Sequence, residues 1–230
     1  MKQLITIFFL IMISILANAE TTKELNYTNQ VFTAVDVETT GFNARNNKIV
    51  EIAAVKFKNG KTIDQKSWLV NPEMHIPYFS QNVHGISDQM VKHQPNFTVV
   101  GTNFIEFVGD SILIAHNATF DAGFIYTEMN RNSIERIQNP FLDSLKMARL
   151  WYPELEKHNL KYLSEHLGFS GETYHRALDD SIYAQMLFLD GLSKNPKFKN
   201  IKYLINKTAI NQNQVLNTLN KKKKKEDGGK

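Results

Sequence analysis

Two acidic residues separated by one position end an apolar run in the segment 36–41, Asp-Val-Glu-Thr-Thr-Gly. Residues two apart on a β-strand point to the same face, so the carboxylates of Asp36 and Glu38 should lie close together. Two unpaired carboxylates on a buried face are costly, and a divalent cation between them removes that cost. Gly41 then lets the backbone turn tightly and approach a ligand. The alternative is a strand end with two solvated acids.

A second group of polar residues stands in the segment 116–121, His-Asn-Ala-Thr-Phe-Asp. It falls where a short apolar strand passes into a helix, and the carboxyl ends of strands are where open α/β sheets bind ligands. Asp121 stands at the start of the predicted helix. Helix capping is therefore the alternative interpretation of Asp121 taken alone.

The third group is the segment 175–180, His-Arg-Ala-Leu-Asp-Asp. Asp180 follows Ala177 by three residues, which places it on the apolar face of the last predicted helix, where an acid needs a partner. Asp179 should point toward solvent. His175 precedes the helix, and in isolation it is more typical of a satisfied surface histidine.

The elements that must bring these groups together follow from the hydrophobic pattern. An antiparallel meander of three strands is predicted first, with the Asn59-Gly60 hairpin signal between its second and third strands. Helices and strands then alternate. The predicted strands are 31–38, 48–58, 61–70, 112–115 and 138–142, and the predicted helices are 96–108, 121–130, one that follows an Asn159 cap and stops at Gly168, and 177–189. This order predicts an α/β fold with a mixed sheet flanked by helices.

Composition limits the chemistry further. The 230 residues are 42% hydrophobic and 22% charged, which is enough to bury a core, and cysteine is absent. Disulfide scaffolds, thiolate zinc sites, iron–sulfur clusters and cysteine nucleophiles are therefore excluded. Any metal must bind carboxylates, imidazoles or carbonyls, which favours hard ions such as Mg²⁺ or Mn²⁺.

Taken together, the three groups resemble the DEDDh group of 3′–5′ exonucleases, and most of all the proofreading epsilon-type exonuclease domain of the ribonuclease H-like superfamily. The match lies in Asp-x-Glu-Thr-Thr-Gly at 36–41, His-Asn-Ala-x-Phe-Asp at 116–121 and His-x-Ala-x-x-Asp at 175–180, in the family's order. His84-Gly85-Ile86 and Asp143-Ser144-Leu145 are weaker supporting matches. The resemblance covers residues 30–192, with no departure at the five catalytic positions.

This resemblance implies a role for each matching residue. Two divalent cations, Mg²⁺ or Mn²⁺, would be held by the four acids, with Asp36 shared, and His175 would be the general base. The other implied positions lie along the substrate. The metal ligands would be Asp36, Glu38, Asp121 and Asp180; Thr39, Thr40 and Gly41 would lie along the terminal nucleotide, Asn117 near its phosphate and His84 near its base, while His116 and Phe120 would support the pocket.

The N-terminus has the three-part pattern of a secretory signal peptide. Lys2 gives a basic start, residues 4–16 are apolar except for Thr6 and Ser14, and Ala17-Asn18-Ala19 presents small residues for cleavage after Ala19. The apolar stretch is too short for a membrane span, so we expect no stable membrane insertion after cleavage. An exported protein, periplasmic or secreted, is predicted; an uncleaved anchor or a buried helix is the alternative.

The formal net charge of +4 belongs to the tail. Residues 221–230 hold six lysines against Glu226 and Asp227, so this segment alone carries +4, and Lys2 balances a body of −1. The charge therefore gives no sign of a basic domain that coats DNA. Four parts are expected along the chain: a signal peptide (1–19), an exonuclease domain (30–192), a peripheral and weakly helical extension (193–220) and a disordered Lys-rich tail (221–230).

The leading hypothesis is an exported, metal-dependent 3′–5′ exonuclease that acts on the 3′ ends of single-stranded DNA or RNA and releases nucleoside 5′-monophosphates. A catalytically silent nucleic-acid-binding module would keep the fold without the chemistry. A proofreading subunit of a DNA polymerase is a third hypothesis, which the leader peptide opposes, and an endonuclease of related fold is a fourth. Protein partners are not predicted.

Overall fold

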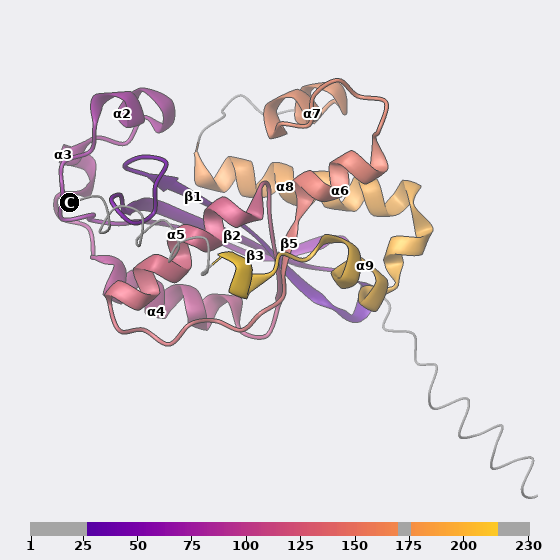
Figure 1. Ribbon diagram of the computed structural model, residues 1–230, viewed down its shortest axis with the longest axis horizontal. Helices are drawn as coiled ribbons and strands as arrows, with labels where there is room; N and C mark the ends of the chain where they lie inside the picture. The colour runs from indigo at the N-terminus through magenta and orange to yellow at the C-terminus, as the bar shows by residue number, and fades with distance from the viewer. Residues whose placement is uncertain (1–26, 170–175, 216–230) are drawn as a thin grey trace, which may run out of the picture.

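The computed structural model describes residues 27–169 and 176–215. The predicted signal peptide, the Lys-rich tail and His175 lie outside these residues. Within the described residues, five strands form one sheet in the order β3-β2-β1-β4-β5 (Figure 1). The strands are β1 (Val31–Thr39), β2 (Ile49–Lys58), β3 (Lys61–Leu69), β4 (Ile112–Ala115) and β5 (Phe141–Asp143).

The first three strands form the predicted antiparallel meander, and β4 and β5 continue the sheet in parallel with β1. Asn59 and Gly60 have φ values of 50° and 75°, the left-handed pair that a tight hairpin between β2 and β3 requires. The central strand, β1, is buried on both faces because its side chains alternate between two apolar clusters: Val35 and Val37 enter one, and Phe32 and Ala34 enter the other.

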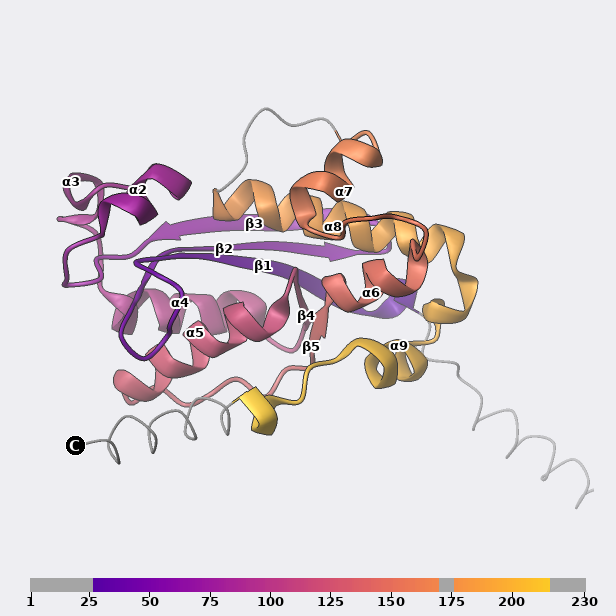
Figure 2. The ribbon, with the colours of Figure 1, turned by 45° about the horizontal axis from the view of Figure 1, so that its top comes forward.

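Helices cover both faces of the sheet (Figure 2). The first apolar cluster packs beneath α4 and α5, and the second beneath α6, α8 and α9. The helical segments are η1 (Tyr27–Asn29), α2 (Tyr78–His84), α3 (Asp88–Val91), α4 (Phe97–Val108), α5 (Ala118–Arg131), α6 (Ser144–Trp151), α7 (Leu160–His166), α8 (Ala177–Lys194), η2 (Pro196–Lys199) and α9 (Ile201–Thr208). The predicted fold class, a mixed sheet flanked by helices, is confirmed.

Three helices were not predicted from the sequence: α2, α3 and α6. All three helices are short. In addition, α2 lacks a clear apolar stripe, because it begins with the exposed residues Tyr78 and Phe79. The helix expected from residue 121 begins earlier, at Ala118, because Asn117 adopts a left-handed conformation (φ 68°) and turns the chain directly out of β4. Asn159 does cap α7, accepting a hydrogen bond from the Tyr162 N–H.

The described part of the segment expected to be peripheral, 193–215, contributes to the core. Phe198, Ile201 and Leu204 are buried against α6 and α8. The chain then runs along β5, where Ala209 pairs with Leu142 and the Ile210 N–H donates to the Phe141 carbonyl at 2.9 Å. This segment therefore covers the β5 edge of the sheet.

None of the helices among the described residues combines the length and the apolar character needed to cross a membrane.

Candidate active site

The two acids on β1 lie in the part of that strand that extends beyond the neighbouring strand β4. β4 pairs with β1 only from Phe32 to Ala34, so the half of β1 that carries Asp36 and Glu38 has no strand on that side. The first turns of α5 fill the space, because α5 begins three residues after β4 ends. Asp121 is buried in the first turn of α5, and its charge acts on Asp36. The N-cap position of α5 is Asn117 rather than Asp121.

The fourth predicted acid comes from the helix on the opposite face of the sheet. Asp36 and Glu38 share the strand face on which α8 packs, and Asp180 lies on α8. Each of these three residues offers a carboxylate oxygen, and the three oxygens lie within 4.8 Å of one another. Asp121 is close enough for its charge to act on Asp36. Three separate elements thus bring the four predicted acids together.

The pKa values of three of these acids, Asp36, Glu38 and Asp121, are shifted in the same direction. Burial, followed by the charges of Asp121 and Asp180, holds the pKa of Asp36 well above its usual range. Burial and the charge of Asp180 raise the pKa of Glu38 to about 8. Burial also raises the pKa of Asp121 to about 8, although two backbone hydrogen bonds oppose the shift. At Asp36, Glu38 and Asp121, burial and the repulsion between carboxylates therefore outweigh the groups that lower the pKa, and a set of several carboxylate oxygens fits hard divalent ions.

A fifth carboxylate at the site, Glu51 on β2, was not predicted. Glu51 pairs directly with Glu38 across the two strands. Its Oε1 accepts hydrogen bonds from Ser67 Oγ at 2.7 Å and Arg176 Nη2 at 2.9 Å, and its Oε2 accepts from Arg176 Nε at 3.1 Å and the Ala177 N–H at 3.3 Å. Burial favours a higher pKa for Glu51, but these hydrogen bonds and the arginine charge lower the pKa below its usual value. Glu51 is thus neutralised by the protein's own donors.

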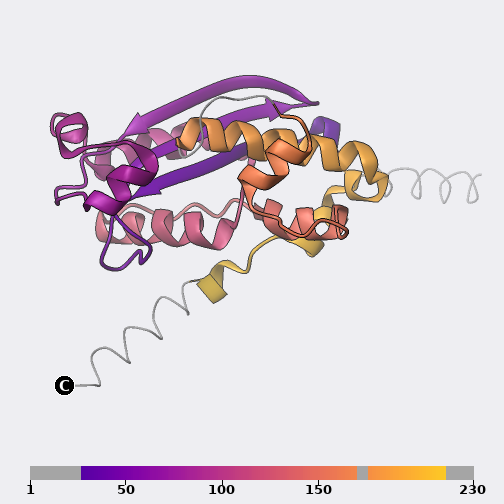
Figure 3. The same cartoon turned by 90° about the horizontal axis from the view of Figure 1, so that it is seen from above.

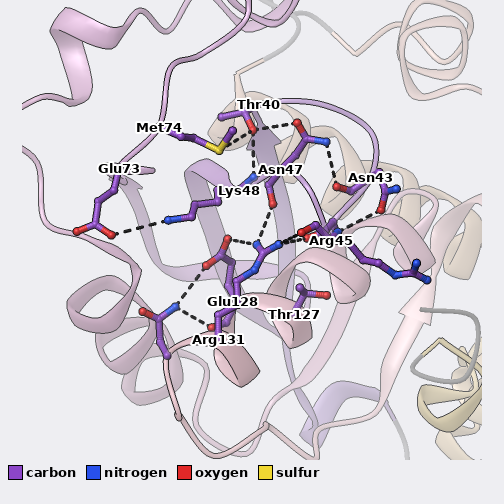
Figure 4. Close-up of polar contacts among 12 residues, drawn as sticks. Thr40, Asn43, Arg45, Asn47, Lys48, Glu73, Met74, Thr127, Glu128 and Arg131 are labelled. Atoms are coloured by element: carbon purple, nitrogen blue, oxygen red, sulfur yellow. Dashed lines mark hydrogen bonds and ion pairs between the residues drawn. The ribbon is translucent and has the colours of Figure 1, made fainter. Parts of the chain in front are cut away.

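The loop after β1, residues 40–47, is held by polar contacts from inside the protein (Figure 4). Thr40 Oγ1 donates to Asn47 Oδ1 at 3.2 Å and accepts from the Lys48 N–H at 3.0 Å, so its hydroxyl is used within the loop. Arg131 at the end of α5 donates to three loop carbonyls and to the buried Glu128. A Cβ on Gly41 would lie 2.6 Å from Asn47 Oδ1, so a larger residue there requires the Asn47 side chain to move.

The loop after β1 and α2 lie at the same end of the sheet (Figure 3), and two further predicted substrate residues, Thr39 and His84, are at the ends of β1 and α2. Thr39 Oγ1 donates to the Gly41 carbonyl at 2.7 Å. His84 at the end of α2 is buried, and its Nδ1 accepts from the Ile86 N–H at 3.0 Å. Burial lowers the pKa of His84, and the nearby backbone of Thr39 partly offsets this shift. The buried Nε2 atom of His84 has no hydrogen-bond partner among the described residues.

The structure separates the two polar residues after β4. His116 is held between Ser144 Oγ at 3.0 Å and the His158 carbonyl at 2.8 Å, which is a supporting position. Asn117 keeps an exposed side chain, and its N–H donates to Asp143 Oδ1 at 3.2 Å, which fixes the turn into α5. Phe120 packs on Phe124 with ring centroids 4.9 Å apart. His175 lies outside the described residues.

An α/β sheet with clustered acids at the open end of its central strand is an architecture of metal-dependent hydrolases. The family model described as an exonuclease, RNase_T, matches residues 33–188. The chain therefore belongs to the RNase_T exonuclease family, and the predicted resemblance to 3′–5′ exonucleases with a divalent-metal site is confirmed at the level of the family.

Relatives of known type agree with this assignment. The DNA polymerase III PolC-type of Clostridium perfringens is 43% identical over 150 residues, which cover 65% of this chain but 10% of that protein. The corresponding protein of Halalkalibacterium halodurans is 39% identical over 150 residues, again 65% and 10%. The chain thus spans about a tenth of the length of these relatives.

Solved structures share the fold. Exonuclease X in complex with 5′ overhanging duplex DNA superposes with a TM-score of 0.58 at 26% identity, covering 72% of this chain and 93% of that one. The zinc-bound E. coli ExoI–ssDNA complex gives a TM-score of 0.69 at 18% identity, covering 77% and 43%. At that identity, the likeness to ExoI concerns the fold alone.

Proposed function

We propose that the protein is an exported 3′–5′ exonuclease that removes nucleoside 5′-monophosphates from the 3′ ends of single-stranded DNA or RNA. The observation that carries this proposal is the convergence of Asp36, Glu38, Asp121 and Asp180 from β1, α5 and α8. We assign these four residues as ligands of two ions, Mg²⁺ or Mn²⁺.

The proposed reaction divides the work between the ions and the protein. Bound divalent cations supply charge stabilisation for the phosphate and the leaving oxygen. The four acids would hold the ions, with Asp36 shared as the family resemblance implies, and the charges of Asp121, Asp180 and Glu38 all act on Asp36. His175, as a neutral imidazole, takes the proton of the attacking water. Thr39, Thr40 and Gly41 present backbone along the terminal nucleotide, with Asn117 near its phosphate and His84 near its base.

The surface beside the cluster supports a single-stranded substrate. Phe42 follows Gly41 directly and is 82% exposed. Its ring stacks on Phe79 of α2, with centroids 6.0 Å apart and an angle of 25° between the planes, and Tyr78 next to it is also exposed. Exposed aromatic rings favour unstacked bases, which a single strand offers and an intact duplex does not. Of the two structural relatives, one is solved with a 5′ overhanging duplex and the other with ssDNA, so the aromatic surface rather than their ligands supports this choice.

Export is proposed from the sequence pattern of residues 1–19. The PolC-type relatives favour the second candidate, a proofreading exonuclease that works with a polymerase, because their matching segment lies within a polymerase. A chain cleaved after Ala19 and transported out of the cytoplasm could not serve that role. N-terminal sequencing of the protein from its native host, with location by cell fractionation, decides between the two.

The test of the chemistry uses purified protein and end-labelled single strands of DNA and RNA with Mg²⁺, Mn²⁺ or chelator. We expect shortening from the 3′ end, 5′-mononucleotide products, and no cleavage with chelator. D36N and D180N should abolish cleavage, whereas D110N, the same change at an exposed residue before β4, should not. Cleavage of a circular single strand would indicate an endonuclease, and normal turnover by both cluster variants would overturn the proposal.

A further inference from the structure

Asp180 depends on the placement of α8 in a way that the other acids do not. Asp36 and Glu38 are fixed by the ladder of the central strand, and Asp121 lies in the first turn of α5, which begins three residues after β4 ends. Asp180 lies in the first turn of a helix packed across the sheet. Its position relative to the other ligands therefore depends on what anchors the start of α8.

That anchor comes from β2. The residue at the N-cap of α8, Arg176, forms no side-chain cap to its own helix. Glu51 supplies the missing acceptor instead, because it binds the Ala177 N–H as well as two nitrogens of the Arg176 guanidinium. One turn later the Asp180 N–H donates to the Arg176 carbonyl at 3.1 Å. A continuous hydrogen-bonded path thus runs from β2 to the backbone of Asp180.

We propose that Glu51 and Arg176 are a positioning pair that sets Asp180 against Asp36 and Glu38, so that metal affinity depends on two residues that do not bind metal. The proposal rests on the ligand assignment made above. All four hydrogen bonds that Glu51 accepts come from protein donors, so its oxygens are already used. Ser67 Oγ, at 2.7 Å, holds Glu51 from β3 and completes the anchor.

A purely electrostatic role for the pair predicts the opposite result for one variant. Arg176 is a cation near the cluster, and its charge lowers the pKa of Glu38. If charge alone mattered, R176M would leave the site more negative and bind cations more tightly. If Arg176 fixes the start of α8, R176M binds them more weakly. Residues that orient metal ligands typically contribute about 10–100-fold to affinity.

The experiment is calorimetric titration of Mn²⁺ into the purified protein and its variants, with folding of each checked by thermal denaturation. We expect R176M to weaken Mn²⁺ binding about 10–100-fold and R176K to weaken it less, since lysine keeps the charge and one donor. The double variant E51Q/R176M avoids an unpaired buried carboxylate and leaves the net charge of the site unchanged. It should still bind weakly, whereas charge alone predicts wild-type affinity.

The matched control is E128Q, which removes the charge of a buried glutamate that pairs with Arg131 in α5. This variant should leave the Mn²⁺ affinity unchanged. Activity measured at saturating Mn²⁺ should return toward wild type in R176M, because the pair acts through binding of the ion. If R176M or the double variant bound Mn²⁺ as tightly as wild type or more tightly, the positioning role would be overturned, but the proposed function would not. Failure of the wild type to bind Mn²⁺, or retention of binding by D36N, would instead overturn the proposed function on which it depends.

Discussion

Neutralising one acid of the cluster should stabilise the metal-free protein while it abolishes activity. We take E38Q as the example. The pKa of Glu38 rises from its ordinary 4.5 to about 8 in the folded protein. The folded state therefore keeps this proton to a higher pH than the unfolded chain does, so stability falls as the pH rises from about 4.5 to about 8.

The size of the effect follows from the same shift. At about 1.4 kcal/mol for each pKa unit, the shift corresponds to an upper limit of about 5 kcal/mol at pH 8. Asp36, Asp121 and Asp180 share the same repulsion, and removing one charge relieves only part of it. We expect E38Q to unfold with a free energy about 2 kcal/mol higher than wild type at pH 8 in chelator, and with nearly the same free energy at pH 4.

The assay is urea denaturation of both proteins at pH 4, 6 and 8 with chelator, repeated at pH 8 with Mn²⁺. Binding to the folded state should stabilise wild type by an amount that grows with the logarithm of the Mn²⁺ concentration above Kd, and should stabilise E38Q less. If E38Q were equally or less stable than wild type at pH 8 in chelator, the charges of the cluster would not be uncompensated, and the electrostatic basis for the metal site would be refuted.

Three further predictions concern catalysis, substrate and packing. H175A should lower kcat about 10²–10⁴-fold with little change in KM for the strand; a change confined to KM would contradict the base role. F42A should raise KM for a single-stranded oligonucleotide about tenfold through lost base stacking, while kcat for a mononucleotide ester stays the same; an unchanged KM would remove the aromatic surface from the substrate path. G191A should lower the free energy of unfolding by about 3 kcal/mol in urea denaturation, because a Cβ at this position on α8 would lie 1.8 Å from the Trp151 ring, and wild-type stability would mean that α6 and α8 are less closely packed.

Much of the fold could be predicted because its strands carry strong local signals. Apolar residues on both faces of β1 indicated a central strand, and Asn59-Gly60 indicated the hairpin. The grouping of the four acids rested on family resemblance as well as on spacing, since nothing local to residues 121 and 180 specifies that α5 and α8 meet the same end of β1. The structure brings these acids together, and the assignment of ions to them stays a proposal.

Glu51 shows what sequence reasoning missed and why. A lone acid inside the apolar run 49–55 is a signal, because burial of a carboxylate requires partners. Its partners, Ser67 and Arg176, are far away in the chain, however, and no periodicity connects them. The short helix α2 was missed for a related reason. Its aromatic residues face solvent rather than a core, so no amphipathic pattern marks it.

The strand-like segment after α9 has a practical consequence for how the protein can be divided. The family match ends at residue 188, yet Phe198, Ile201 and Leu204 complete the apolar layer over α6 and α8, and Ala209 closes the outer edge of β5. A fragment cut at the family boundary would bare both that layer and a free strand edge, the surfaces through which partly folded chains associate. We therefore expect the smallest fragment that folds stably to be longer than the stretch that carries the acids, and truncation studies of this enzyme should retain Val215, which is buried in the first apolar cluster.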